Sequence, residues 1–144
     1  MIRILNNIIE DLRKDGYSVN GRYGPKDKLA GNMDSVAITF YFDMVKYVTN
    51  RETLDRTHKM FYLLGVDSLD ADLILSVEQW EYLDKLNQSF FLKLRNYQNS
   101  EGQQLISIIS DMNVDHFPDY YLFEKSVSGL KVDFNIKLQS VDGC

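Results

Sequence analysis

A long amphipathic segment between residues 77 and 97 is the feature that most constrains the fold of this chain. Apolar and aromatic side chains recur there every three or four positions, which places them on one face of a helix. The segment contains no Gly or Pro, and Ser76 and Gln79 have the spacing of a capping box. We therefore expect a helix from Val77 to about Tyr97, with this apolar stripe: Trp80, Leu83, Leu86, Phe90, Leu94 and Tyr97.

Residues 36–48, upstream of that helix, alternate with a period of two. β-Branched and aromatic residues are enriched there, which predicts one long strand. Its second face is only partly polar, so we expect a strand that is central or covered on both sides. Residues 57–66 have the composition of a second strand, and the polar residues 50–55 between them predict a hairpin. One face of the first strand carries Val36, Ile38, Phe40, Phe42 and Met44.

A second hairpin is expected at the end of the chain, after Pro118 interrupts the preceding pattern. Residues 120–125 and 130–138 are its predicted strands, with the turn at 126–129. The last strand has one core face and one solvated face. Residues 105–109 are apolar but too few to distinguish a strand from a helix. The core face of the last strand carries Leu130, Val132, Phe134, Ile136 and Leu138.

Another amphipathic helix is predicted at residues 2–12, with Gly16 as its left-handed stop. Residues 18–35 are dense in turn formers and predict a long flexible loop. The chain has 144 residues, close to the commonest domain size. We therefore expect a single α+β domain over residues 1–144, whose mostly antiparallel sheet packs against an N-terminal helix and one long central helix.

The charge is unevenly distributed along the chain. Residues 1–66 hold ten Lys and Arg against eight Asp and Glu, a balance of +2, whereas residues 67–144 hold six against thirteen, a balance of −7. The acidic second half argues against a nucleic-acid surface, which needs clustered cations. The asymmetry would suit head-to-tail packing of subunits, and a polarised surface of a monomer is the simpler interpretation.

One cysteine, Cys144, excludes an intramolecular disulfide and fits a reducing compartment. Polar residues interrupt the apolar positions of residues 2–12, so no signal peptide is predicted. No apolar run approaches the length of a membrane span. We expect cytoplasmic localisation at synthesis and no contact with a membrane.

The sequence contains no recognisable catalytic motif. The two histidines are His58, on a predicted strand, and His116, which lies near Asp111, Asp115 and Asp119. That cluster could bind a cation or act in acid–base chemistry, and solvated loop side chains are the simpler explanation. The spacing of Asp67, Asp70 and Asp72 lacks the glycine and distal glutamate of a calcium loop. We therefore expect no catalytic residue, no metal and no cofactor.

Partner contact is the functional role that the remaining features favour. A basic, aromatic group in the predicted loop could bind a phosphate backbone or an acidic partner, although a plain solvated loop is the simpler interpretation. Tyrosines on predicted strands suit interfaces as well as sheet packing. The acidic turn before the central helix has the same two interpretations. The candidate contact residues are Arg22, Tyr23, Lys26, Lys28, Tyr41, Tyr47, Asp67, Asp70 and Asp72.

The order of the predicted elements resembles that of the neck and tail proteins of tailed bacteriophages, notably tail terminators. The helix at 2–12, the strand at 36–48, the helix at 77–97 and the strand at 130–138 carry this resemblance. It implies a structural subunit that forms a homo-oligomeric ring through sheet edges and loops and resides in the virion. The family has no catalytic signature to carry over.

Three functional hypotheses follow. The first is a non-enzymatic structural protein that assembles with other protein subunits. The second is an acidic immunity or inhibitor protein, in which residues 67–84 would block the cationic active site of a toxin. The third is an enzyme that uses Asp115, His116 and Asp119.

Overall fold

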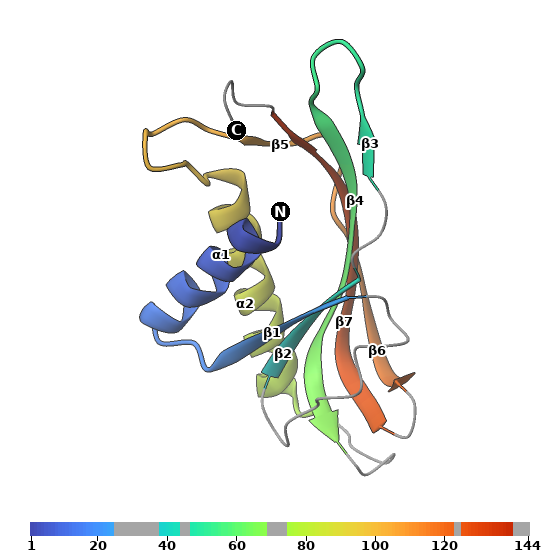
Figure 1. Ribbon diagram of the computed structural model, residues 1–144. Helices are drawn as coiled ribbons and strands as arrows, with labels where there is room; N and C mark the ends of the chain where they lie inside the picture. Colours follow the sequence, from blue (N-terminus) through green and yellow to red (C-terminus); the bar gives the residue numbers. More distant parts are fainter. Residues whose placement is uncertain (25–37, 44–46, 69–74, 123–124, 140–144) are drawn as a thin grey trace.

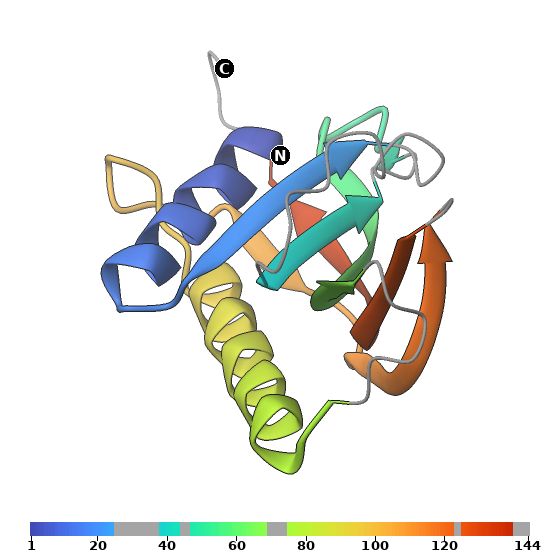
Figure 2. The same ribbon diagram turned by 90° about the horizontal axis from the view of Figure 1, so that it is seen from below.

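Two helices cover one face of a mainly antiparallel sheet in the computed structural model, which describes residues 1–24, 38–43, 47–68, 75–122 and 125–139 (Figures 1 and 2). The described residues form an α+β fold, as the sequence predicts. Its elements are α1 (Ile2–Lys14), β1 (Val19–Gly24), β2 (Ile38–Asp43), β3 (Tyr47–Thr49), β4 (Arg56–Ser68), α2 (Val77–Arg95), β5 (Ile106–Ile108), β6 (Asn113–Leu122) and β7 (Lys125–Leu138).

The two longest strands, β4 and β7, form the centre of the sheet. They pair antiparallel over their whole length, from Arg56 opposite Leu138 to Ser68 opposite Ser126. The other edge of β4 carries β3 near its start and β2 further along, and β7 carries β5 and β6 in the same end-to-end manner. Strand β1 extends the sheet beyond β2 and is parallel to it.

The core lies between the helices and the sheet, where the predicted apolar faces meet. α1 buries Leu5, Ile8, Ile9 and Leu12, and α2 buries Leu83, Leu86, Phe90 and Leu94. Phe90 is the aromatic centre, since its ring centroid lies 4.8 Å from Phe40, 5.3 Å from Tyr62 and 5.6 Å from Phe42. Alternate residues of β7 from Leu130 to Ile136 complete this core, as the period of two predicts.

The predicted cap of α2 and the predicted glycine stop after α1 are confirmed. The Ser76 side chain accepts a hydrogen bond from the Gln79 amide at 3.2 Å, and the Ser76 amide donates to Gln79 Oε1 at 2.8 Å, which completes the capping box. Gly16 has a φ of +98° just after α1, the left-handed conformation that glycine adopts most readily. α2 ends at Arg95, two residues before the predicted end.

The predicted loop at 18–35 is wrong over its first part, because Val19–Gly24 form strand β1. Val19 is buried, and the Tyr23 ring stacks on Phe42 at 5.4 Å between centroids. The backbone of β1 pairs with β2, nineteen residues further along the chain, as the pair Val19–Ile38 shows. Local turn formers say nothing of such a distant partner. Residues 25–35 of the expected loop lie outside the described part of the chain.

The described residues of the predicted strand at 36–48 form β2 and β3, and the expected hairpin with 57–66 is confirmed. Residues 36–37 and 44–46 lie outside the described part of the chain. The terminal hairpin is placed differently from the prediction. Residues 126–129, the expected turn, lie inside β7, and Leu122 pairs with Lys125. Pro118 lies within β6, where the register shifts between Phe117 and Tyr120. A bulge accommodates a residue that has no amide hydrogen. The ambiguous segment at 105–109 contributes strand β5.

Candidate interaction surface

The hairpin formed by β3, residues 50–55 and the start of β4 projects past the helices (Figure 1). Asn50 holds its turn: the side-chain Oδ1 accepts hydrogen bonds from the amides of Glu52 at 2.9 Å and Thr53 at 3.0 Å. The Asn50 amide donates to the Asp55 carbonyl at 2.8 Å and closes the loop. A rigid turn of this kind presents its outer side chains in a defined arrangement.

Large apolar side chains point into solvent on this hairpin. Val48 is 68% exposed and Leu54 is 59% exposed, and Tyr47 is also exposed. Leu54 has a φ of +62°, a left-handed conformation that is uncommon for a residue with a branched side chain. A non-glycine residue in this sparsely populated region costs free energy, so the conformation of Leu54 is an outlier on an exposed turn.

The outer edge of β3 is open, because β4 is the one strand that pairs with it among the described residues. An edge strand presents unpaired amide and carbonyl groups that a further strand or loop can bind. Here the open edge coincides with the exposed apolar side chains. The hairpin therefore combines the two features by which one protein chain recruits another.

A buried histidine lies at the base of the hairpin. His58 is 6% exposed, and its ring lies 4.9 Å from that of Tyr47. The Arg56 guanidinium lies 4.6 Å from the centre of the Tyr47 ring. Within the described part of the chain, His58 Nε2 has no hydrogen-bond partner. Burial lowers the pKa of His58, and the positive charges of the N-terminal amine and Arg56 lower this pKa further. The ring is thus held in its neutral form as a packing group.

The second candidate site joins α2 to β6. His116 Nε2 donates a hydrogen bond to Asp84 Oδ1 at 3.0 Å, and the imidazole lies 5.0 Å from the ring of Trp80. Sequence spacing pointed instead to Asp111, Asp115 and Asp119 as its neighbours. The fold corrects this, since the acidic partner comes from a helix 32 residues earlier in the chain. Sequence patterns carried no signal for a pair that exists only after β6 docks beside α2.

Both side chains of this pair are largely exposed. The described residues also contain no group of three or more His, Cys, Asp or Glu side chains close enough to hold a metal ion. What the site offers is an aromatic surface beside carboxylates. Such a surface suits recognition of a cationic partner.

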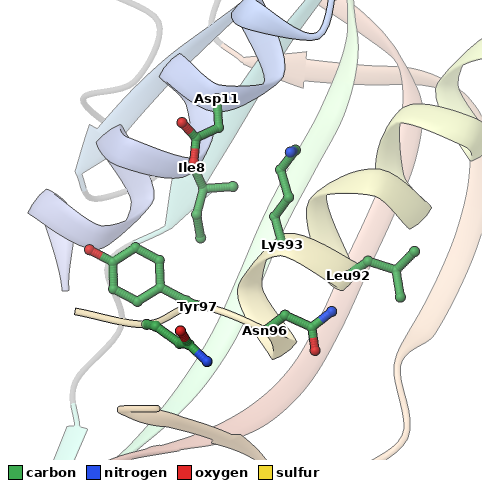
Figure 3. A pocket seen from close by; sticks show the side chains of 7 residues that line it. Ile8, Asp11, Leu92, Lys93, Asn96 and Tyr97 are labelled. Atoms are coloured by element: carbon green, nitrogen blue, oxygen red, sulfur yellow. The ribbon is translucent and has the colours of Figure 1, made fainter. Parts of the chain in front are cut away.

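Two hollows lie at the ends of α2. One, of about 330 Å³, lies where α1 and the last turn of α2 diverge (Figure 3). Polar contacts close to it hold the helices together: Lys93 Nζ lies 2.7 Å from Asp15 Oδ2, and Asn7 donates to the Tyr97 hydroxyl at 3.1 Å. Its lining residues are Ile8, Asp11, Leu92, Lys93, Asn96, Tyr97 and Gln98.

The other hollow, of about 320 Å³, lies between the first turns of α2 and the ends of β2 and β4. It is lined by Ile38, Val66, Glu78, Gln79, Tyr82 and Leu83. Gln79 is already engaged in the capping box, and the apolar residues are part of the packing between helix and sheet. Neither lining brings a histidine, cysteine or serine together with a base, so both hollows reflect helix packing.

The residues predicted as partner contacts are dispersed. Tyr41 is 1% exposed and pairs with Leu63, which is also buried, so a partner cannot reach it on this monomer. The Tyr23 ring packs onto the core, and its buried hydroxyl finds no hydrogen-bond partner among the described residues. Burial raises the pKa of Tyr23 to about 12. Arg22 is half-buried on β1. Tyr47 is exposed on the hairpin, where the neighbouring Val48 and Leu54 were missed.

Of the charged residues predicted as partner contacts, only some lie in the described part of the chain. Asp67 lies on β4 opposite Val127. Lys26, Lys28, Asp70 and Asp72 lie outside the described residues. The apolar residues Val48, just before the polar segment at 50–55, and Leu54, within it, were the sequence signal that could have identified the hairpin surface.

No protein family model matches this chain, and no curated protein matches it. Neither helix in the described part of the chain has the length and apolar character needed to cross a bilayer.

Proposed function

We propose that this chain is a non-enzymatic structural subunit that assembles with further copies of itself into a ring, in the manner of the neck and tail components of tailed bacteriophages. The observation that carries the proposal is the projecting β3–β4 hairpin. Its tip is apolar and exposed, its edge strand is open among the described residues, and its turn is held by hydrogen bonds.

Burial of this surface would be favourable. Removing apolar surface from water contributes roughly 25 cal/mol per Å², and an exposed edge strand gains backbone hydrogen bonds when it is paired. A monomer that remained alone would keep both features in water. The hairpin is therefore better explained as a contact made in an assembly than as a solvated turn.

The assembly can be tested by mass photometry and sedimentation velocity over a range of concentrations. We expect the wild-type chain to form one discrete oligomer as its concentration rises. Val48→Asp should remain monomeric, because a charge on the edge strand would be buried at the contact, and its circular dichroism should match the wild type. Leu92→Asp replaces an exposed apolar residue on α2 and is the matched control, which should assemble normally.

A wild-type chain that is monomeric at every concentration, alone and with the other proteins of its source, would refute the proposal. Assembly of Val48→Asp at the wild-type concentration would remove the hairpin as its basis.

An acidic inhibitor is the second candidate, and one observation favours it. Glu78, Glu81 and Asp84 recur along the first half of α2 beside the partly buried Trp80. A row of carboxylates around an aromatic ring could cover a cationic active site. Affinity capture from the source organism tests this role: recovery of a nuclease or another basic toxin in a one-to-one complex would favour it over ring assembly.

A further inference from the structure

We infer that the β3–β4 hairpin of one copy docks on the acidic, aromatic end of α2 and β6 of the next copy, so that the subunits pack head to tail. This inference rests on the proposed function and names the surface that receives the hairpin. We call that surface the α2–β6 patch and define it by Val77, Trp80, Glu81, Asp84, Val114 and His116.

The hairpin is the cationic partner. Arg51, Arg56 and Lys59 are exposed on it, and Glu52 is its exposed acidic residue. Its other carboxylate, Asp55, is half-buried and pairs with Lys137 of β7 at 3.3 Å. When the Asp55–Lys137 pair is left out, the three cations and one anion give the hairpin a net charge of +2. These charges accompany the exposed apolar residues Val48 and Leu54.

The α2–β6 patch has the opposite charge and a similar apolar character. Val77 is 68% exposed, Val114 is also exposed, and the rings of Trp80 and His116 lie 5.0 Å apart. Glu81 and Asp84 supply the negative charge on the same stretch of helix. Partly buried tryptophans surrounded by polar residues are the usual energetic centres of protein interfaces.

The two surfaces lie at opposite ends of the molecule. Figure 1 shows the hairpin at one end of the long β4 strand and the first turn of α2 at the other. Two different surfaces that complement each other form a heterologous contact, which repeats from copy to copy and forms a ring where the rotation between copies closes. Hairpin-to-hairpin pairing would instead place like charges together.

Charge reversal tests the contact. One variant, Arg51→Glu with Arg56→Glu, makes the hairpin acidic, and the other, Glu81→Lys with Asp84→Lys, makes the patch basic. In each variant like charges face each other, so we expect its self-association to weaken by about a hundredfold or more. All four residues are on the surface, and unchanged melting of each variant would show that the fold is intact.

An equimolar mixture of the two variants is the decisive sample. Each acidic hairpin then meets a basic patch and each basic hairpin meets an acidic patch, so mass photometry should show oligomers again, built from alternating variants. Recovery by mixing supports the head-to-tail contact. If the patch variant alone assembles as the wild type does, the contact lies elsewhere and the inference is overturned, while the proposed ring stands. A wild-type chain that does not assemble overturns both.

Discussion

His58 shows how a single residue links the sheet to the candidate interaction surface. It lies on β4 opposite Ile136 on one side and Tyr47 on the other, where the hairpin emerges from the core. The groups that face it are the Tyr47 ring, the Arg56 guanidinium and the N-terminal amine, none of which is an anion. A proton on this ring would be buried among positive charges, so the folded state disfavours the charged form.

The stability of the protein should therefore fall in mild acid. The pKa of His58 is lowered from 6.5 in the folded state, so below about pH 6.5 the unfolded chain binds a proton that the folded chain resists. The unfolding free energy should decrease as the pH falls from 6.5 through the folded pKa, and this contribution should vanish above pH 6.5. Urea denaturation at several pH values would measure it.

His58→Phe is the matched variant for that measurement. It keeps an aromatic ring against Tyr47 and removes a buried nitrogen that has no hydrogen-bond partner, so stability near pH 7 should be nearly unchanged. Its unfolding free energy should depend less on pH than that of the wild type in the acid range. An equal dependence in both proteins would show that His58 is not the responsible group.

At the scale of elements, the pairing of the central strands β4 and β7 depends on a close approach of their backbones. Gly129 pairs with Gly65, and a Cβ atom placed on Gly129 would lie 2.1 Å from the Leu64 carbonyl oxygen and 2.6 Å from the Gly65 Cα. A side chain cannot occupy that space without separation of the two strands. Gly129 therefore serves the close approach of two backbones and not the turn that its sequence neighbours suggest.

Gly129→Ala should destabilise the fold by about 3 kcal/mol or more, because the contacting atoms belong to the backbone of the central strand and cannot move aside. Gly102→Ala is the control. Gly102 has a φ of +78° in open space, so its substitution costs the left-handed conformation alone, about 1 kcal/mol. Urea denaturation would compare them, and equal losses would contradict the steric explanation.

At the scale of the whole molecule, stability is distributed unevenly. β4 and β7 pair on both sides, whereas β3 and β5 are strands of three residues that pair on one side among the described residues. The candidate interaction surface is thus built on one of the least supported strands. Segments that bind partners are often of low local stability, because they gain their remaining contacts on binding.

Hydrogen exchange should report this distribution. Amides of β4 and β7 should exchange most slowly, and those of β3 and β5 rapidly in the dilute monomer. As concentration rises and assembly proceeds, peptides that cover β3 and residues 50–55 should become protected, whereas β5 should not change. Exchange of the hairpin that is independent of concentration would contradict its role in assembly.

Local patterns were sufficient for much of the fold. The capping box before α2, the stripe from Leu83 to Leu94 and the alternation of β7 depend on neighbours a few residues away, and each was confirmed. The secondary structure could not be predicted for segments in which the apolar pattern was short or mixed. β5 is a strand because β7 supplies its hydrogen bonds, and no property of three residues could reveal that.

The sequence by itself determined which faces are apolar, where the helices begin, and that helices and an antiparallel sheet share one core, because periodicity and capping are local. The tertiary structure decided the parallel docking of β1, the burial of Tyr41, the pairing of His116 with Asp84 and the exposure of Val48 and Leu54. Those features depend on which distant segments meet, since a strand partner, a covering layer or a projecting edge exists only once the chain has folded.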